Sequence, residues 1–274
     1  MIEEFDKLAA TIRAKANGRQ IIYVPNPGNF GDGLIRHATK VFFHDYGIPH
    51  LEINVGFRGG KLVLTPALIE NIFRQNYFFI YGGGGAWHSK YRFGKTIVDF
   101  IATATPHYLV LPSTYEIFPA KAKGTFFCRD QYQSKIKAPQ SIFCHDMAFY
   151  LVATGQLLGG DSKKPVHRNG FLFRGDAESD TDDNLLPASN VDLSLEGNHM
   201  SPADIFVHRV AQYEIINTDR LHVSIAACLC NRQVNLVTGS YFKIQAIYNS
   251  SMLNQFENVR LFKDAGNLLC QIDD

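Results

Sequence analysis

Short runs of β-branched and aromatic residues alternate along this chain with stretches of helical periodicity, and this alternation constrains the fold more than any other feature. The predicted strands of the first half are residues 20–24, 51–55, 77–81, 107–111, 125–128 and 141–144. Between the first two strands, residues 33–46 place their apolar side chains on one helical face, and a further helix is predicted to begin at Thr65-Pro66. The order strand, helix, strand predicts βαβ units and therefore a parallel sheet.

A second set of such units follows a polar stretch. Residues 155–169 include paired glycines, paired lysines and a proline, a composition typical of a linker. Beyond it, predicted strands at 170–174, 213–217 and 233–238 alternate with helices that begin near residues 201–204 and 218. We therefore predict an α/β protein made of two doubly wound, Rossmann-like parallel-sheet domains, residues 1–158 and 159–274, that face a cleft in a GT-B-like architecture.

Composition narrows the classes of partner. The chain has 274 residues, of which 46% are hydrophobic, and 27 basic residues stand against 26 acidic ones, so no global field would attract nucleic acid. No uncharged apolar run reaches the ~20 residues that span a bilayer, and the first residues lack the basic and apolar regions of a secretory signal. We expect a cytoplasmic protein whose contact with a membrane, at its inner face, would be peripheral.

Two glycine-rich loops follow predicted strands of the first half, where ligands of parallel sheets bind. In the loop 25–33 the glycines run GxxGxG, which is not the dinucleotide fingerprint. Asn29 and Asp32 are candidate ligand-binding residues there. The alternative interpretation is a tight turn in which Asp32 caps the following helix.

The second loop contains four consecutive glycines, 82–85. Glycines in such a run lose much backbone entropy on folding, so we expect a ligand to approach Gly83 and Gly84 closely. Trp87, His88 and Arg92 follow, a mixture suited to stacking on a sugar and bonding its hydroxyls, although each residue taken alone would be ordinary surface. These residues predict that the first domain binds a sugar acceptor.

Candidate residues of the second half are mostly cationic. Arg174 is expected at a strand end, Arg220 and His222 in the first turn of a helix, and Lys243 after the next strand. Because these positions share one edge of a parallel sheet, they predict a site for an anion. For His222 the alternative is a structural role. The acidic run 176–183 contains the triplet Asp180-Thr181-Asp182, which is more typical of a solvated loop than of a metal site, and we predict no metal.

Several short motifs, in this order, resemble those of the polysaccharide pyruvyltransferase family. They are GNFGD at 28–32, the glycines at 82–85, CRD at 128–130, HDMAF at 145–149, TDRLH at 218–222 and GSYFK at 239–243. The similarity implies a GT-B-like fold and phosphoenolpyruvate as the donor substrate, with no other cofactor. It also implies an acceptor that is a sugar of a surface polysaccharide or of its lipid-linked precursor.

The family resemblance further implies roles for individual residues. Arg220, Leu221 and His222 correspond to the family's RLH, in which His222 would be catalytic, and Arg174 and Lys243 would complete the donor site. An imidazolium suits delivery of a proton to the methylene carbon of phosphoenolpyruvate. Two alternatives remain open at this point: a GT-B glycosyltransferase that uses a nucleotide sugar, and a non-catalytic carbohydrate-binding protein.

Overall fold

The computed structural model contains two compact units, each built around its own parallel sheet. It describes residues 1–58, 61–63, 66, 76–87, 93–118, 123–156, 158, 164–176, 178–179 and 181–272. The first unit comprises Met1–Pro27 and Ile35–Tyr150, and the second comprises Gly28–Leu34 and Leu151–Asp274. The division after residue 150 precedes the predicted boundary at 158. Residues 28–34, expected in the first domain, belong with the second unit.

The first unit has a seven-stranded parallel sheet. Its strands are β1 (Gln20–Val24), β2 (His50–Glu52), β5 (Tyr77–Tyr81), β6 (Gly84–Trp87), β7 (Tyr108–Tyr115), β8 (Thr125–Cys128) and β9 (Ile142–Phe143). They follow the order β2-β1-β5-β7-β8-β9, with β6 paired to β7. Every residue of β7 is buried, as expected of a strand inside a parallel sheet. A separate antiparallel pair joins β3 (Gly56–Arg58) to β4 (Lys61–Val63).

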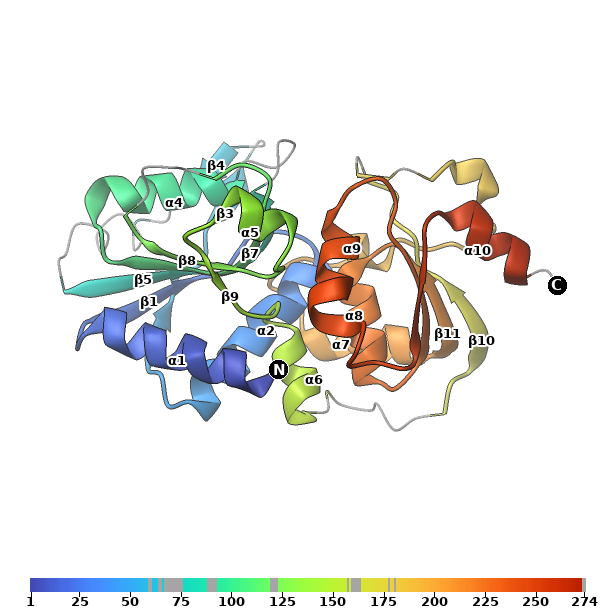
Figure 1. Ribbon diagram of the computed structural model, residues 1–274, viewed down its shortest axis with the longest axis horizontal. Helices are drawn as coiled ribbons and strands as arrows, with labels where there is room; N and C mark the ends of the chain where they lie inside the picture. The colour runs from blue at the N-terminus through green and yellow to red at the C-terminus, as the bar shows by residue number, and fades with distance from the viewer. Residues whose placement is uncertain are drawn as a thin grey trace. The chain divides into compact units, whose positions relative to one another are not determined.

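Helices cover both faces of this sheet, which is why its strands are apolar on both sides. They are α1 (Ile2–Ala16), α2 (Phe30–Asp45), α4 (Phe93–Ala104), α5 (Gln133–Lys137) and α6 (Phe149–Thr154). Figure 1 shows α1 and α2 on one side of the sheet and α4 on the other. The helix predicted to begin at Thr65-Pro66 lies almost entirely outside the described residues.

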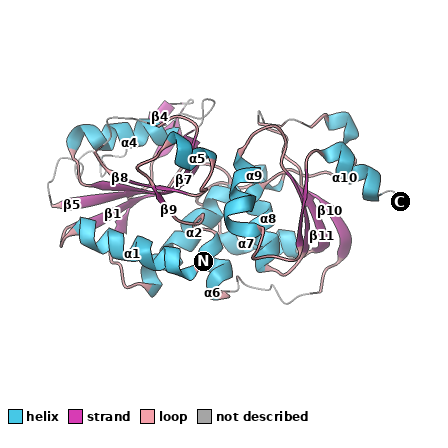
Figure 2. Cartoon of the chain, in the orientation of Figure 1, coloured by secondary structure: helices cyan, strands magenta, loops and turns pink. Residues whose placement is uncertain are grey.

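The second unit has a four-stranded parallel sheet in the order β10-β11-β12-β13. Its strands are β10 (His167–Phe171), β11 (Tyr213–Thr218), β12 (Gln233–Val237) and β13 (Val259–Phe262). Its helices are α7 (Ala203–Ala211), α8 (Leu221–Leu229), α9 (Lys243–Ile247) and α10 (Ala265–Ile272), with helical turns η1 (Asp183–Leu185), η2 (Leu193–Glu196) and η3 (Tyr248–Met252). In the secondary-structure colouring of Figure 2, α7 and α8 lie on one side of this sheet and α10 on the other.

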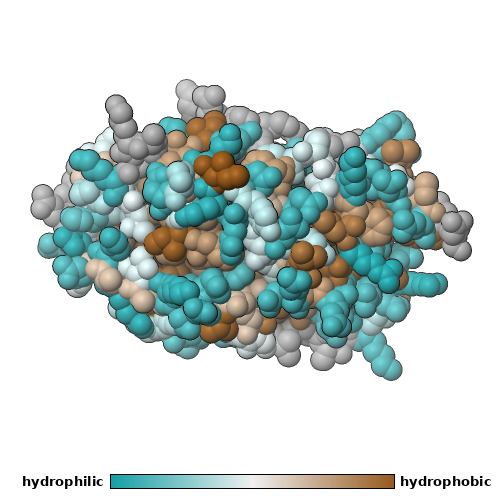
Figure 3. All heavy atoms as spheres, in the orientation of Figure 1, coloured by the Kyte–Doolittle hydropathy of each residue, from teal (hydrophilic) through white to brown (hydrophobic). Residues whose placement is uncertain are grey.

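The predicted fold class is confirmed at the level of a mixed α/β protein with parallel, Rossmann-like sheets. Within the described ranges, no helix is long and apolar enough to span a membrane. The face drawn in Figure 3 carries hydrophobic side chains scattered among hydrophilic ones rather than gathered in one broad patch. Isolated exposed apolar residues of this kind are ordinary on protein surfaces.

Candidate functional site

The sequence-predicted cations of the second half lie at one edge of the second unit's sheet. Arg174 comes three residues after β10 rather than at its last position, because β10 ends at Phe171. Arg220 comes two residues after the end of β11 at Thr218 and stands at the N-cap position of α8. The backbone N–H of Arg174 donates a hydrogen bond to Oδ1 of Asp219 (2.8 Å), which ties the two strand ends together.

Two of these cations share a single carboxylate. The ammonium of Lys243, the first residue of α9, lies 2.7 Å from Oε2 of Glu178. The same oxygen accepts a hydrogen bond from Nη1 of Arg174. Burial alone would raise the pKa of Glu178, but the charges of Lys243 and Arg174 outweigh burial and lower that pKa to about 2. Glu178 is therefore ionised at neutral pH.

Arg220 is paired on all three of its guanidinium nitrogens. Nη1 lies 2.8 Å from Oδ2 of Asp176, Nε donates to Oδ1 of Asp192 (3.1 Å), and Nη2 pairs with Oδ2 of Asp192. Asp176 also lies 3.4 Å from Nε of Arg174. The result is one alternating chain of charges, which runs Lys243, Glu178, Arg174, Asp176, Arg220 and Asp192.

This chain of charges contains three cations and three carboxylates, so their formal charges sum to zero. Its members are largely buried, and buried charges are tolerated only when paired. Asp219 adds a fourth carboxyl beside the chain. Burial raises the pKa of Asp219 to about 6, although its bond from Arg174 and the nearby guanidinium charges act in the opposite direction. The sequence predicted the cations but not their compensation by Asp176, Glu178 and Asp192.

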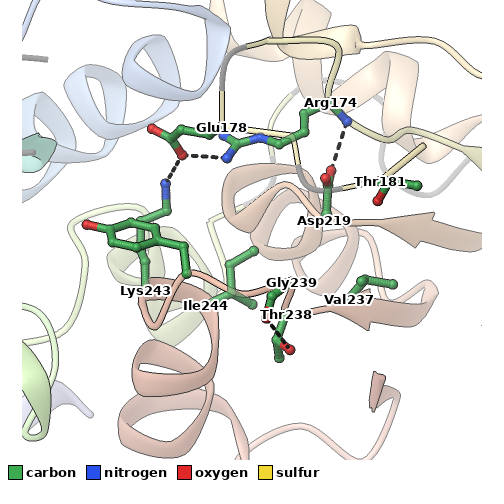
Figure 4. A pocket seen from close by; sticks show the side chains of 10 residues that line it. Arg174, Glu178, Thr181, Asp219, Val237, Thr238, Gly239, Lys243 and Ile244 are labelled. Carbon is green, nitrogen blue, oxygen red and sulfur yellow. Dashed lines mark hydrogen bonds and ion pairs between the residues drawn. The ribbon is translucent and has the colours of Figure 1, made fainter. Parts of the chain in front are cut away.

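A pocket lies beside this chain of charges (Figure 4). Its lining residues are Arg174, Glu178, Thr181, Asp219, Val237, Thr238, Gly239, Tyr241, Lys243 and Ile244. It encloses about 340 Å³, part of which is open solvent. Because charged side chains form much of its lining, the pocket suits a polar or charged ligand.

His222 lies in the first turn of α8, as predicted, and it packs against the segment Gly28–Leu34 within the second unit. A Cβ atom placed on Gly31 would lie 2.5 Å from Nδ1 of His222, so the ring occupies the space that a side chain at Gly31 would need. The same segment is held by His199, whose backbone N–H donates to the carbonyl of Gly28 (3.0 Å). The fold therefore brings the segment 28–34 beside His222, although the two are far apart in the sequence.

Asn29 and Asp32, expected to bind an acceptor, make local turn contacts in this segment. The carboxylate of Asp32 accepts the N–H of Asn29 (3.0 Å), and Oδ1 of Asn29 accepts the N–H of Gly31 (2.9 Å). Asn29 also forms an isolated bridge with Asn198. These contacts favour the turn interpretation in part: the helix is capped by Asn29 rather than by Asp32, because α2 begins at Phe30 and Asp32 lies within its first turn. The segment belongs to the second unit rather than the first.

The prediction that a ligand approaches the second glycine loop, residues 82–85, is also corrected by the structure. A Cβ atom on Gly83 would lie 2.9 Å from the carbonyl carbon of Leu111 and still closer to the carbonyl oxygen of Pro112. Gly84 has a φ of 107°, a conformation that side chains disfavour. What passes close to this loop is the chain's own β7, so ligand binding is not the reason for glycine at Gly83, and backbone conformation accounts for Gly84.

The prediction that Trp87 stacks on a sugar is also wrong. Its side chain is 2% exposed and packs in the core against Tyr115 and Phe126, with ring centroids 5.5 and 6.1 Å away. It cannot stack on a sugar from that position. His88 and Arg92 lie outside the described residues.

Leu221, assigned to the donor site by resemblance, is a buried apolar residue, so its side chain contributes packing. Asp180 of the acidic triplet lies outside the described residues, and in the part of the chain that is described no group of three potential metal ligands converges.

The first unit contains a buried ion pair that residue-by-residue reasoning missed. Nη1 of Arg129 lies 2.6 Å from Oδ2 of Asp146, with the two side chains 1% and 0% exposed. Nε of Arg129 donates to Oγ1 of Thr114 (2.8 Å), and the second oxygen of Asp146 accepts the N–H of Ala148 (2.9 Å). The available signal was the presence of both residues in the CRD and HDMAF motifs. The pair connects the end of β8 to the segment after β9.

The fold and the site together define a two-unit α/β protein with a charged pocket at one sheet edge. No protein-family model matches the sequence, and no curated protein matches it significantly. Its structure is similar to the crystal structure of an uncharacterised protein, KP1_0663, from Klebsiella pneumoniae subsp. pneumoniae NTUH-K2044. The two share 26% sequence identity and a TM-score of 0.73, over 94% of this chain and 98% of the other.

Proposed function

We propose that this chain is a pyruvyltransferase, which moves the enolpyruvyl group of phosphoenolpyruvate onto a sugar to form a pyruvate ketal. The observation that carries the proposal is the gathering of charged groups in the second unit: two cations, Arg174 and Lys243, line a small pocket, and a third, Arg220, pairs with Asp176 in the same chain of charges. A histidine, His222, lies at the start of α8 in the same unit. The order of motifs that resembles the polysaccharide pyruvyltransferases supports it independently.

These side chains carry the functional groups that the proposed chemistry requires. Arginine and lysine bind carboxylate and phosphate, the two anionic groups of phosphoenolpyruvate. Protonated His222 would give its proton to the methylene carbon, which becomes a methyl group and leaves a cationic carbon beside it. One sugar hydroxyl adds to that carbon, and a second then displaces inorganic phosphate. The hydroxyl protons balance the proton delivered to carbon and the one that leaves with phosphate.

We extend the proposal to the architecture and the acceptor. The two Rossmann-like units would form a GT-B-like enzyme in which the second unit binds the donor and the first binds the acceptor. Packing explains Gly83 and Trp87, and backbone conformation explains Gly84. Asn29 and Asp32 make turn contacts in the second unit, so the acceptor side depends on His88 and Arg92. The acceptor would be a sugar of a surface polysaccharide or of its lipid-linked precursor. The enzyme would bind it in the cytoplasm, at the inner face of the membrane.

Isothermal titration with phosphoenolpyruvate and a panel of nucleotide sugars tests the donor assignment. Wild-type protein should bind phosphoenolpyruvate, and Arg174→Ala or Arg220→Ala should weaken binding by about 1.5–3 kcal/mol, the scale of a charged hydrogen bond. Arg260→Ala is the matched control, because Arg260 is an exposed arginine on β13 of the same unit.

Two results would contradict the proposal. Binding of a nucleotide sugar in place of phosphoenolpyruvate would indicate a glycosyltransferase. Tight binding of a sugar with no donor and no turnover would indicate a carbohydrate-binding protein.

A further inference from the structure

Glu178 occupies the space between two cations that border the pocket. Its Oε2 accepts from Arg174 and lies 2.7 Å from the ammonium of Lys243, and its side chain is 8% exposed. Figure 4 shows the carboxylate of Glu178 between the two cationic groups at the pocket's rim. One oxygen of a carboxylate that bridges a guanidinium and an ammonium is the arrangement a bound carboxylate or phosphate would make.

The two cations are held in place by contacts other than those with Glu178. Arg174 is fixed through its backbone N–H by Asp219 (2.8 Å), and its Nε lies 3.4 Å from Asp176. Lys243 begins α9, and its ammonium lies 5.5 Å from the centroid of the Tyr241 ring. Glu178, by contrast, belongs to no helix or strand. Its departure would therefore leave both cations positioned.

We propose that Glu178 marks an anion subsite between Arg174 and Lys243, and that a ligand carboxylate or phosphate monoester binds by replacing the Glu178 carboxylate. Glu178 thus determines specificity, because a ligand must compete with an intramolecular anion already held by both cations. A dianion competes better than a monoanion, since each additional negative charge interacts with the same two cations. The identity of the ligand rests on the proposed function. Its negative charge rests on the contacts of Glu178 with Arg174 and Lys243.

The test is the affinity for inorganic phosphate and, separately, for phosphoenolpyruvate, measured by calorimetry for wild type, Glu178→Gln and Glu178→Ala. Removing the competing charge should tighten phosphate binding by about tenfold, because a like charge within hydrogen-bonding distance opposes the anion. Asp182→Asn is the matched control. Asp182 is an exposed carboxylate on the same segment, bonded to Asn184, and its replacement removes the same net charge.

The outcomes separate this inference from the proposed reaction. Tighter phosphate binding in either Glu178 variant, with Asp182→Asn unchanged, supports the subsite even if phosphoenolpyruvate is not a donor. Phosphate affinity that falls, stays unchanged or is undetectable in both folded Glu178 variants overturns the subsite, even if pyruvyl transfer is observed. Thermal unfolding of each variant establishes that it is folded, and the alanine variant provides the result if the glutamine variant is unstable.

Discussion

The contact between Gly31 and His222 makes a quantitative prediction for Gly31→Ala. The new Cβ would lie 2.5 Å from Nδ1, 2.9 Å from Cγ and 3.0 Å from Cβ of His222. Ordinary contact begins near 3.4 Å, so the ring or the first turn of α2 must move by roughly 1 Å. A displacement of about 1 Å at a reacting group can cost ~10²-fold in rate, or about 2.7 kcal/mol of barrier. We expect kcat to fall by about that factor.

The assay is release of inorganic phosphate from phosphoenolpyruvate in the presence of acceptor, combined with NMR of the His222 ring. Gly33→Ala is the matched control, because its Cβ would meet the carbonyl oxygen of Asn198 at 3.1 Å rather than the histidine. That variant should keep kcat within about threefold of wild type. If the His222 signals shift in Gly31→Ala while kcat is unchanged, the position of the ring does not control the reaction.

Three further predictions concern other parts of the molecule. Asp146→Ala should destabilise the first unit by about 3–5 kcal/mol in urea unfolding, because it leaves the buried guanidinium of Arg129 unpaired; a loss under about 1 kcal/mol would contradict the buried pair. Since the pKa of Asp219 is raised to about 6 in the folded state, its contribution to stability is present below about pH 4 and is lost as the pH rises through about 6. In Asp219→Asn the free energy of unfolding should therefore fall less between about pH 4 and pH 7 than it does in wild type. An equal fall in the two proteins would refute the raised pKa of Asp219. Gly83→Ala should lower the thermal unfolding temperature through its clash with Pro112, so a stable variant with a raised acceptor KM would instead favour a binding role.

The strands were largely predictable because their signal is local. The strands β1, β5 and β8 have the predicted boundaries, since each is a compact run of β-branched and aromatic residues bounded by turn residues. The strand β10 begins three residues earlier than predicted and ends three residues earlier, because Leu172 and Phe173 are apolar residues buried beyond the strand rather than part of it.

The glycines were misread because their reason lies elsewhere in the chain. A run of four glycines indicates that something approaches the backbone, but the sequence cannot say whether it is a ligand or another strand. For Gly83 the neighbour is β7, and for Gly31 it is His222, almost two hundred residues away. The same long-range contacts assign residues 28–34 to the second unit.

The structure brings the predicted cations together, but their pairing with carboxylates was not predicted. Interpreted as a solvated acidic run, residues 176–183 gave no reason to expect Asp176 and Glu178 to turn back onto Arg174. Their spacing, two and four residues after Arg174, was the available signal. Asp192 could not have been predicted, because it reaches Arg220 from another segment.

The central proposal is that the chain transfers an enolpyruvyl group through protonation of its methylene carbon. Turnover of phosphoenolpyruvate with candidate lipid-linked oligosaccharides in D₂O, analysed by mass spectrometry and NMR of the product, tests it most directly. We predict release of phosphate and a ketal whose new methyl group carries one solvent deuterium, with formation slowed at least about a hundredfold in His222→Ala. A ketal without solvent deuterium, or sugar transfer from a nucleotide sugar with no consumption of phosphoenolpyruvate, would contradict it.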